Sequence, residues 1–398
     1  MHKNILFLQG PVGSFFRQLA DFMAKQDDVT TYQIALNGGD DIFARSKRTT
    51  AYVGKPQDWS EFLKAYLSKH NITDIVVFGD CRFYHRIAKK VASEQGIQLW
   101  AFEEGYLRPS FITLEREGVN SNSLFSNELF EQFNSTGLSL SESENLTRRN
   151  SFWFMSVNAF IYYFFKLIYS YKYKHYIHHR PWLFSEETYS WVRAAVRKVT
   201  YAYNDYKLSK SIKSSLSKQY FLVPLQVSVD SQILFHSPFG SVEEFISTVI
   251  ESFAKNADKD DFLVFKHHPM DRGFTNYQRF IKKLCYAYDL NQRVIYCHDT
   301  HLPTLLKHAK GTITVNSTVG ISSLHHGTPT KVLGNAIYNI AGMTSQKELH
   351  EFWNISCKPC VDKFSKFTQF LKENNQIPGS FYMKPTNTFA AISKIILS

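Results

Sequence analysis

A hydroxyl-rich turn follows an apolar run in the last third of the chain. Residues Gly311 to Val315 are typical of a buried strand, and Asn316-Ser317-Thr318-Val319-Gly320 comes next and opens a helical stretch. A helix N-terminus offers unpaired N–H groups and the positive end of the helix dipole, and the Ser317 and Thr318 hydroxyls add donors. The pattern therefore suits a phosphate. An ordinary N-cap also uses Ser or Thr, so both interpretations stay open for this turn alone.

A histidine and a proline follow a second strand-like run, Phe262 to Lys266. The chain continues as His267-His268-Pro269. A histidine at a strand end can donate a hydrogen bond to an anionic leaving group or act as an acid, and proline fixes the turn that aims it. A structural loop histidine is the alternative. No carboxylate or cysteine around this pair has the spacing of a metal site, so no metal is predicted.

Carboxylates follow strand-like runs in the first half of the chain. Glu103 and Glu104 stand side by side before Gly105, which turns the chain, and Asp80 and Glu115 follow other apolar runs. Adjacent carboxylates at a strand end suit acid–base or nucleophilic chemistry, because a like-charged neighbour or partial burial raises one pKa. A helix cap or a solvated loop is the alternative interpretation.

Composition indicates a folded globular protein with an anionic partner. The 398 residues carry a formal net charge of +11, with 44% hydrophobic and 20% charged residues, which excludes disordered, collagen-like and long coiled-coil chains. Aromatic residues reach 16%. A basic, aromatic-rich chain favours a nucleotide, a nucleic acid or a membrane with acidic lipids as the partner.

The motifs disfavour several classes of chemistry. Five cysteines, with one isolated Cys357-Lys-Pro-Cys360 pair, do not make a disulfide framework or a complete zinc site. The Gly10 to Gly13 spacing fits neither a dinucleotide fingerprint nor a P-loop. Nucleic-acid binding is disfavoured because no zinc finger or RNA-recognition aromatic pattern is found.

Short apolar runs alternate with amphipathic stretches in both halves of the chain. The predicted strands are Ile5–Leu8, Thr31–Leu36, Asp74–Phe78, Gln98–Phe102, Tyr220–Pro224, Phe262–Lys266, Val294–Tyr296, Gly311–Val315 and Lys331–Leu333. Helical stretches between them include Ser14–Lys25, Trp59–His70, Arg86–Gln95, Ser241–Lys255, Phe274–Tyr288 and Leu302–His308. This rhythm predicts an α/β fold with open parallel sheets, in which ligands bind at the carboxyl ends of strands.

The middle of the chain is aromatic and basic. A polar loop is expected over 137–150, and Ser151 to Ser170 is almost wholly apolar or aromatic. Between residues 145 and 185 there are six Lys or Arg and no acidic residue. The length would allow a membrane-spanning helix, but the polar and tyrosine content favours an interfacial one. Contact of 151–180 with lipid, internal packing and a true span are the three possibilities.

The order of these motifs resembles that of a known family. It is similar to two-domain GT-B glycosyltransferases that use CMP-activated sugars, and more closely to the retaining β-Kdo transferases of capsular polysaccharide biosynthesis and export, of the KpsS/LipB-like type. The motifs that carry the resemblance are Gln9-Gly-Pro with Phe15-Phe16, Gly79-Asp-Cys-Arg-Phe-Tyr-His85, Glu103-Glu-Gly-Tyr-Leu-Arg-Pro109, Pro224-Leu-Gln226, His268-Pro269, Ser317-Thr-Val-Gly320 and Gly327-Thr-Pro329.

The resemblance implies two Rossmann-like domains facing a central cleft, and a reaction. Kdo would move from CMP-Kdo to an anionic phospholipid, (lyso)phosphatidylglycerol, to start the poly-Kdo linker of a capsule. CMP-Kdo is the donor substrate, no cofactor is expected, and no metal is implied because a single phosphate leaves. Another CMP-sugar transferase of the sialyltransferase-like kind, or a non-catalytic capsule assembly or export subunit, is the alternative.

The resemblance also implies residue roles. His268 and Pro269 would contact the CMP phosphate, Ser317 and Thr318 would hold it, and Gly320 would allow its close approach. Glu103 and Glu104 match the acidic motif that supplies the base in sialyltransferase-like relatives, and Glu115 and Asp80 are further candidates for a nucleophile. The remaining predicted contacts are Lys266 and Asn316 to the donor, and Gly10, Arg82, Arg108 and Gln226 to the substrate; Lys266, Arg82 and Arg108 would face the Kdo carboxylate or the lipid phosphate.

The expected organisation follows. Residues 1–210 form an acceptor-side domain with an aromatic and basic insertion at about 151–210, residues 211–375 form a CMP-sugar-binding domain, and 376–398 form a terminal helix. The first apolar run is too short for a signal peptide, so we expect a cytoplasmic protein, peripheral on the inner face of the inner membrane. A capsule biosynthesis or export complex is a further expected partner.

Overall fold

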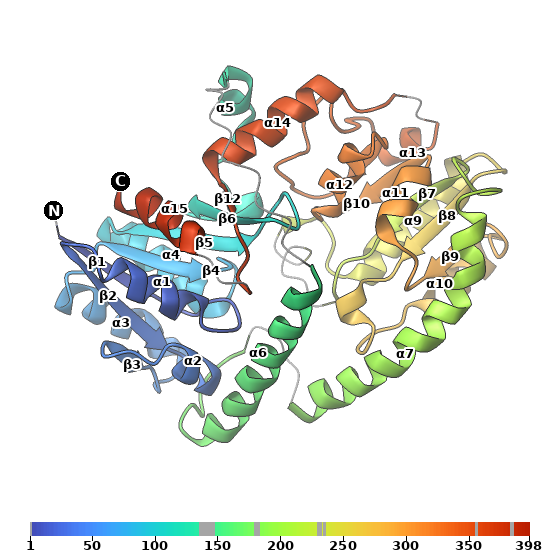
Figure 1. The fold of residues 1–398 in the computed structure, drawn as a ribbon. Helices are drawn as coiled ribbons and strands as arrows, with labels where there is room; N and C mark the ends of the chain where they lie inside the picture. The colour runs from blue at the N-terminus through green and yellow to red at the C-terminus, as the bar shows by residue number, and fades with distance from the viewer. Residues whose placement is uncertain are drawn as a thin grey trace. The chain divides into compact units, whose positions relative to one another are not determined.

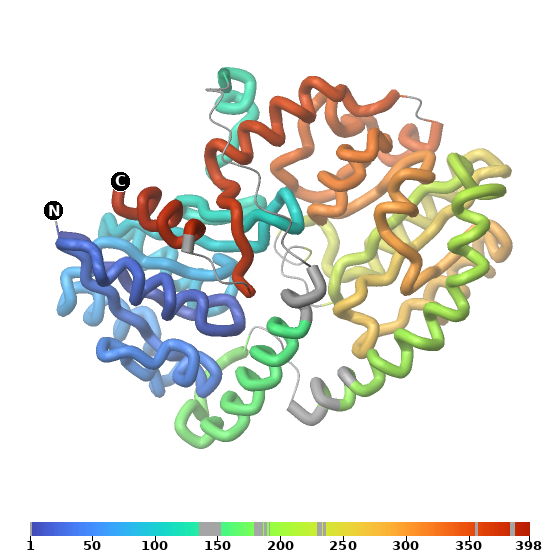
Figure 2. Tube along the Cα trace, viewed as in Figure 1, coloured from blue at the N-terminus to red at the C-terminus, as the bar shows by residue number. Residues whose placement is uncertain are grey.

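The computed structural model describes residues 2–134, 148–178, 184–228, 233, 236–354, 357–382 and 386–398. They form two compact units, Met1–Pro181 with Thr368–Ser398, and Trp182–Phe367. In each unit helices cover a sheet of mainly parallel strands (Figure 1), and the chain trace in Figure 2 shows the last segment returning to the first unit. The predicted α/β class with two sheet-based domains is confirmed.

The first unit is built on a seven-stranded sheet in the order β12-β6-β5-β4-β1-β2-β3. Its strands are β1 (Lys3–Phe7), β2 (Val29–Ala35), β3 (Thr49–Ala51), β4 (Asp74–Phe78), β5 (Gln98–Glu104), β6 (Phe111–Arg116) and β12 (Gln376–Pro378). Side chains of β1 alternate between the two faces, as a strand requires. Leu6 and Leu8 join one buried cluster, and Ile5 and Phe7 join the other.

Helices cover both faces of this sheet. Helices α3 (Trp59–Lys69) and α4 (Phe83–Gln95) supply the cluster that holds Leu6, and α1 (Phe15–Met23) and α15 (Thr386–Leu397) supply the cluster that holds Phe7. The remaining helices of the unit are α2 (Gly38–Phe43), α5 (Asn127–Gln132) and α6 (Arg148–Ile168), with 3₁₀ turns at Pro56–Asp58, Asn120–Asn122 and Tyr169–Tyr171. Helix α14 (Val361–Asn374) runs from the second unit into the first.

The second unit is built on a five-stranded parallel sheet in the order β11-β10-β7-β8-β9. The strands are β7 (Tyr220–Pro224), β8 (Phe262–Lys266), β9 (Val294–Cys297), β10 (Gly311–Thr314) and β11 (Thr330–Val332). The helices are α7 (Phe184–Ser211), α9 (Val242–Asn256), α10 (Gln278–Ala287), α11 (Leu302–His308), α12 (Val319–His325) and α13 (Leu349–Phe352), with a 3₁₀ turn at Pro269–Asp271.

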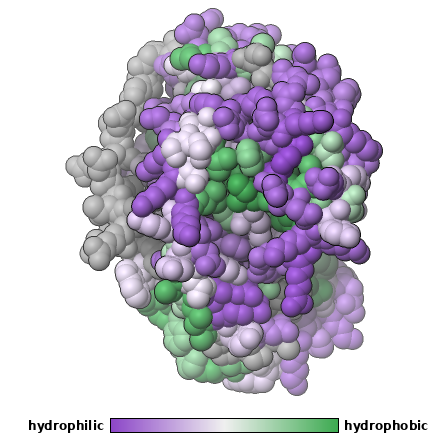
Figure 3. Space-filling model, turned by 90° about the vertical axis from the view of Figure 1, so that its right-hand side faces the viewer, coloured by the Kyte–Doolittle hydropathy of each residue, from purple (hydrophilic) through white to green (hydrophobic). Residues whose placement is uncertain are grey.

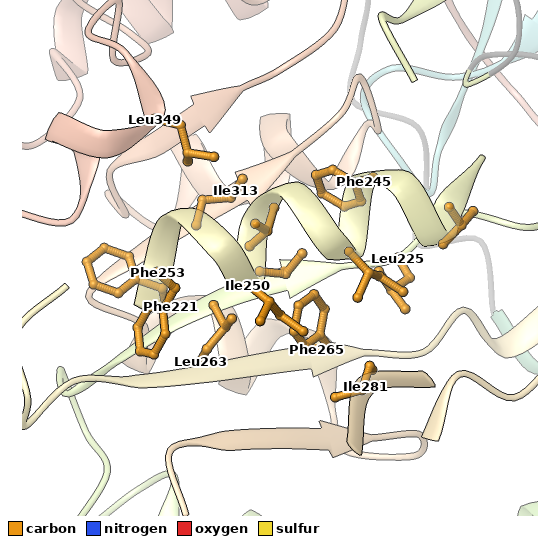
Figure 4. Close-up of a cluster of buried hydrophobic side chains, with 14 of the residues drawn as sticks. Phe221, Leu225, Phe245, Ile250, Phe253, Leu263, Phe265, Ile281, Ile313 and Leu349 are labelled. Atoms are coloured by element: carbon orange, nitrogen blue, oxygen red, sulfur yellow. The ribbon is translucent and has the colours of Figure 1, made fainter. Parts of the chain in front are cut away.

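Helix α9 shows how the sequence fixes the core of this unit. Its buried residues recur at helical spacing, and Ser241 caps its start by accepting a hydrogen bond from the Glu244 N–H at 3.1 Å. Figure 4 shows Phe245, Ile250 and Phe253 of this helix lying over Phe221 and Phe265 of the sheet. Full burial of such a side chain stabilises the fold by roughly 1.5–3 kcal/mol.

The structure differs from the expected organisation in three respects. The sheet of the first unit is not wholly parallel, because β6 runs antiparallel to β5 and β12. The domain boundary lies at Pro181 rather than at 210, because α7 bonds to loops of the second unit. Residues 368–375 also belong to the first unit, because β12 pairs with β6 beyond them.

The aromatic segment of α6 has two faces. Tyr162 and Tyr163 are buried against the first unit, and Gly38 and Gly39 allow this contact, since a Cβ at Gly39 would lie 2.5 Å from the Tyr162 ring. The opposite face exposes Trp153, Val157, Phe160, Phe164 and Leu167. Internal packing and an exposed apolar face thus coexist on one helix. The expected loop at 137–150 falls mainly outside the described residues, as does Arg180.

Exposed apolar side chains are not spread evenly over the molecule. The face in Figure 3 is largely hydrophilic, with hydrophobic side chains gathered in limited patches. Most of the large hydrophobic side chains that are exposed among the described residues lie between Trp153 and Tyr206. No helix in the described ranges is both long and apolar enough to cross a bilayer.

Candidate functional site

The first unit brings several predicted residues to the carboxyl edge of its sheet. Strand order reverses between β1 and β4, and such a reversal opens a crevice where α/β proteins bind ligands. Gln9 follows β1 and Arg82 follows β4, and the Arg82 Nη1 donates to the Gln9 Oε1 at 2.9 Å and to the Gly10 carbonyl at 3.4 Å. The two sides of the crevice are therefore joined by a charged hydrogen bond. Gly10 is explained by packing, because a Cβ there would lie 2.8 Å from the Phe16 ring.

Glu103 and Glu104 end β5 and point to opposite faces of the sheet, because successive strand residues alternate. Glu103 pairs with Thr113 of β6 and therefore shares the α4 face with Glu115. A Cβ built at Gly79 would lie 3.7 Å from both the Glu103 Oε2 and the Arg82 Nε. The acidic pair is thus divided, and Glu103 is the member next to Arg82.

Burial changes the acidity of both glutamates. It raises the pKa of Glu103 to about 7, and the Glu104 charge adds to the rise while the Arg82 and Arg108 charges oppose it. It also raises the pKa of Glu104, against the opposing charge of Arg108. A carboxyl with a pKa near 7 exists in both protonation states at neutral pH, so Glu103 can act as a base, an acid or a nucleophile.

Asp80 and Glu115 already have partners that fix them in place. The Asp80 Oδ2 accepts from the Asn122 amide at 2.8 Å and from the Val119 N–H at 3.4 Å. The Glu115 Oε1 accepts from the Tyr106 hydroxyl at 2.9 Å, and its Oε2 accepts from Ser123. Burial raises the pKa of Glu115 to about 7. Both carboxylates hold the segment that follows β6.

Arg108 is exposed and turns back on its own loop. Its Nε donates to the Gly105 carbonyl at 3.2 Å, and its charge acts on both Glu103 and Glu104. Arg108 thus lies in the loop after β5, near the acidic pair, and its contact with the Kdo carboxylate or the lipid phosphate stays a prediction.

A buried polar cluster behind Gln9 was not predicted. The Gln9 Nε2 donates to Asp40 at 3.1 Å and contacts the Tyr162 and Tyr176 hydroxyls at 2.9 Å, and Tyr162 comes from α6. Burial raises the pKa of Asp40 to about 6, although donors from Gln9 and the Leu36 N–H oppose the rise. The Asn37-Gly-Gly-Asp40 turn after β2 is the sequence signal that could have indicated a site here. The cluster links α6 to the crevice.

The second unit repeats this arrangement at its own reversal of strand order, between β7 and β10. Gln226 follows β7 and Asn316 follows β10, and the Gln226 Nε2 donates to the Asn316 Oδ1 at 3.1 Å. The Asn316 N–H faces the Gln226 Oε1 at 3.5 Å. Both predicted residues therefore lie at the crevice floor.

The hydroxyl-rich turn lies at this edge. The Ser317 Oγ accepts from the Val319 N–H at 3.2 Å, as in an ordinary turn before a helix, and Thr318 precedes α12 directly. A Cβ at Gly320 would lie 2.3 Å from the Tyr338 hydroxyl, and that hydroxyl donates to the Ser317 carbonyl. Gly320 is therefore required by its packing against Tyr338, and its predicted role in the close approach of a phosphate stays a prediction.

The histidine motif lies at the end of β8, next to β7. His268 caps the 3₁₀ turn that begins at Pro269, and its Nδ1 accepts from the Met270 N–H at 3.2 Å. Because Nδ1 accepts, the neutral ring carries its proton on Nε2, as a donor to an anion requires. His268 is half-buried and Pro269 is exposed. Lys266 is buried, and its ammonium donates to the His267 carbonyl at 3.0 Å and to the His298 carbonyl, so it ties two loops together.

A shallow hollow of about 530 Å³ lies at the carboxyl end of β11. Its lining includes His236, Lys331, Gly334 and Glu348, and the His236 carbonyl accepts from the Asn316 amide at 3.3 Å. The hollow is therefore next to the crevice floor of the second unit, and its volume is in the range of small-ligand sites. Within the described residues no three His, Cys, Asp or Glu are grouped so that they could hold a metal.

Comparisons with known proteins agree with one another. A family profile described as "Capsule polysaccharide biosynthesis protein" matches residues 73–382. The chain is 40% identical over 387 residues to the capsule polysaccharide modification protein LipB of Neisseria meningitidis serogroup B, which covers 96% of this chain and 92% of that one. It is 38% identical over 383 residues to the capsule polysaccharide export protein KpsS of Escherichia coli, with 96% and 97% covered.

Among solved structures, the β-Kdo 2,7 transferase of Thermosulfurimonas dismutans KpsC is similar to this chain with a TM-score of 0.46 and 14% identity. The match covers 92% of this chain and 89% of that one.

Proposed function

Because the chain belongs to the capsule polysaccharide biosynthesis protein family, we propose that it is a glycosyltransferase that moves Kdo from CMP-Kdo to (lyso)phosphatidylglycerol. The product would start the poly-Kdo linker of a capsule. The order of the sequence motifs supports CMP-Kdo as the donor, and the net charge of +11 supports the binding of anionic substrates. The observation that carries the proposal is Glu103, a half-buried carboxyl of raised pKa. It lies beside Arg82, which follows β4 at the reversal of strand order.

The second unit would bind the nucleotide. The His268 Nε2–H and the Ser317 and Thr318 hydroxyls can donate to the phosphate, and the hollow beside Asn316 has room for part of the nucleoside. Gln226 holds Asn316 in position. Lys266 acts one step away, by fixing the loop that carries His268. A single phosphate leaves, so these donors can stabilise it without a metal.

Glu103 would be the nucleophile of a retaining double displacement. In the first step its oxygen bonds to the anomeric carbon of Kdo while the bond from that carbon to the phosphate oxygen breaks, and CMP leaves with the electron pair. In the second step the lipid hydroxyl oxygen bonds to that carbon and the bond to Glu103 breaks. The hydroxyl proton passes to the released carboxylate, which its raised pKa allows it to hold near neutral pH. Arg82 would face the Kdo carboxylate.

Asp80 and Glu115 support the site and do not react. Their oxygens are engaged by Asn122, Tyr106 and Ser123, and using them on a sugar would break those bonds. This assignment chooses Glu103 among the four candidate carboxylates that the sequence left open.

The exposed face of α6 would bring the enzyme to its lipid acceptor. Trp153, Val157, Phe160 and Phe164 recur at helical spacing on that face, and Lys174 is exposed shortly after it. We therefore propose a peripheral position on the inner face of the inner membrane. Flotation of the purified protein with phosphatidylglycerol vesicles tests this, and a protein that stays at the bottom of the gradient contradicts it.

The transferase proposal is tested with purified protein, CMP-Kdo made in situ and a fluorescent phosphatidylglycerol analogue, with mass spectrometry to detect one added Kdo. Glu103→Gln is expected to lower the rate more than about a hundredfold, because it removes the nucleophile. Glu104→Gln is the matched control, since it makes the same change one residue away on the opposite face, and it should keep the rate within about tenfold. His268→Ala should lose the product through weaker CMP binding.

Other outcomes would overturn parts of the proposal. Loss of activity in Glu104→Gln alone would move the nucleophile to that residue. Transfer from CMP-Neu5Ac in preference to CMP-Kdo would favour a sialyltransferase-like enzyme. Intact CMP binding with no transfer from any donor would favour a non-catalytic capsule assembly or export subunit.

A further inference from the structure

Helix α7 presents an apolar stripe along most of its length. Tyr189, Val192, Val196, Val199, Tyr203 and Tyr206 are all exposed, and they recur every three or four residues. That spacing places them on one side of a helix. The helix has 28 residues, so it is about 42 Å long. A stripe of this kind on a folded protein marks a contact surface.

The opposite face of α7 is fixed to the second unit. Ser190 and Asp205 are buried, and the Asp205 carboxylate accepts from the His298 N–H at 2.8 Å. The Arg193 side chain donates to the Phe274 carbonyl at 2.9 Å, and the Arg197 side chain donates to the Arg272 carbonyl at 2.8 Å. The stripe therefore cannot turn inward without breaking these bonds.

The charges beside the stripe are positive over most of its length, and the exposed Glu186 lies one helical turn before its first residue. Between Thr188 and Ser211 the sole acidic residue is Asp205, which is buried on the inner face. Lys198, Lys207 and Lys210 are exposed, and the Lys210 ammonium lies 4.6 Å from the centre of the Tyr206 ring. Valines occupy the middle of the stripe and tyrosines its ends. Tyrosine and lysine are the residues that favour the boundary between headgroups and acyl chains.

We propose that α7 docks the second unit on an anionic phospholipid bilayer, with its stripe at the acyl boundary and its lysines at the headgroups. The inference deepens the proposed function and rests on it for the choice of lipid. Each lysine near such a surface contributes to binding through its attraction to anionic headgroups. A protein surface is the competing occupant, and the exposed lysines Lys198, Lys207 and Lys210 along the stripe favour an anionic lipid surface.

Docking through α7 would have a consequence for the donor motif. Arg197 donates to the carbonyl of Arg272, four residues after His268, and Arg193 donates to the carbonyl of Phe274, six residues after it. A helix with its side chains is about 10–12 Å across. The loop that carries His268 would therefore lie within about one helix diameter of the lipid surface, where a lipid headgroup is the acceptor.

The test is flotation with two kinds of vesicle, phosphatidylcholine alone and phosphatidylcholine with about 30 mol% phosphatidylglycerol, with no sugar donor present. Tyr203→Glu is compared with Tyr286→Glu, because both tyrosines are 83% exposed in the same unit and only Tyr203 belongs to the stripe. The double variant Lys207→Glu/Lys210→Glu on α7 is compared with the double variant Lys282→Glu/Lys283→Glu on α10. Both double variants change the net charge by the same amount. We expect the α7 variants to lower the bound fraction on anionic vesicles about fivefold or more, and the α10 variants to leave it unchanged.

Each other outcome overturns the proposal or separates it from the proposed function. Equal binding by the α7 and α10 variants overturns it. Self-association of the wild type that Tyr203→Glu abolishes, without vesicle binding, assigns the stripe to a second copy instead. Vesicle binding through α7 in a protein that transfers no sugar would keep this inference and refute the transferase. Normal thermal unfolding of each variant shows that it has folded.

Discussion

Glu103 gives the sharpest prediction, because the same burial that prepares it for chemistry destabilises the fold. Its pKa rises from 4.5 to about 7 mainly because burial disfavours the charged form. In the unfolded chain the group ionises near its ordinary value. The folded protein therefore binds more protons than the unfolded one between about pH 4.5 and pH 7, and its stability falls as pH rises through that window.

The magnitude follows from the shift. One pKa unit corresponds to about 1.4 kcal/mol, so the rise corresponds to about 3 kcal/mol, and solvent screening of this half-buried group lowers the expected value to about 2 kcal/mol. Glu103→Gln has nearly the same shape and no charge, and its side-chain oxygen can still accept from the Glu104 N–H. The variant should match the wild type at pH 4.5 and be about 2 kcal/mol more stable at pH 8.

The measurement is urea unfolding at the two pH values, monitored by pulsed hydrogen exchange. Peptides from β4 and β5 report the unfolding of the first unit by itself. Glu94→Gln is the control, since Glu94 is exposed and Lys64 lowers its pKa, so its loss should not stabilise the protein at pH 8. A Glu103→Gln variant that is less stable at pH 8, or that differs equally at both pH values, would refute the reasoning. The variant should also be inactive, so a gain in stability would accompany the loss of function.

Three further predictions follow from packing and anchoring. Gly39→Ala should free α6 from the first unit, because its Cβ would collide with the Tyr162 ring, and limited proteolysis should then cut within α6. Asp205→Ala should raise the Kd for CMP severalfold, because the loop after β9 loses its acceptor, and isothermal titration should show this with the fold intact by circular dichroism. Phe253→Ala should lower the stability of the second unit by about 3–5 kcal/mol in urea unfolding, since its ring is fully buried in the core.

The local sequence pattern predicted much of the fold. Strands β7 and β8 and helix α11 have the bounds that their apolar runs predicted, because short parallel strands buried on both faces read as continuous apolar segments. The apolar run before Glu115 was predicted to be strand-like, but the antiparallel direction of β6 was not, since it depends on pairing with β5 and with β12, which lies more than 250 residues later. The boundary at Pro181 was missed because the inner face of α7 is defined by bonds to distant loops.

The sequence indicated several residues that lie at the candidate site, but it did not indicate the hydrogen bonds that connect them. Arg82 and Gln226 follow β4 and β7, at the carboxyl ends where ligands were expected, but the reversals of strand order at these strands were not predicted. The division of Glu103 from Glu104 follows from strand alternation once β5 is known to extend through both. Asp40 and Tyr162 were missed because their hydrogen bond joins residues 122 apart in the chain, and no local pattern reports such a contact.

In each unit a glutamine joins the residues at the floor of the crevice, which makes that floor sensitive to a change of very few atoms. An amide donates and accepts without adding charge, so Gln9 can give hydrogen bonds to Asp40 on one side and take one from Arg82 on the other. Hydrolysis of that amide to an acid would place two carboxyl groups about 3 Å apart and remove the amide donor to Asp40, leaving the Tyr162 hydroxyl as a donor near both. Chemical ageing of this one buried side chain would then weaken the contacts of both α6 and Arg82, and stored protein would change without any cut in its chain and with a mass change of only about one dalton.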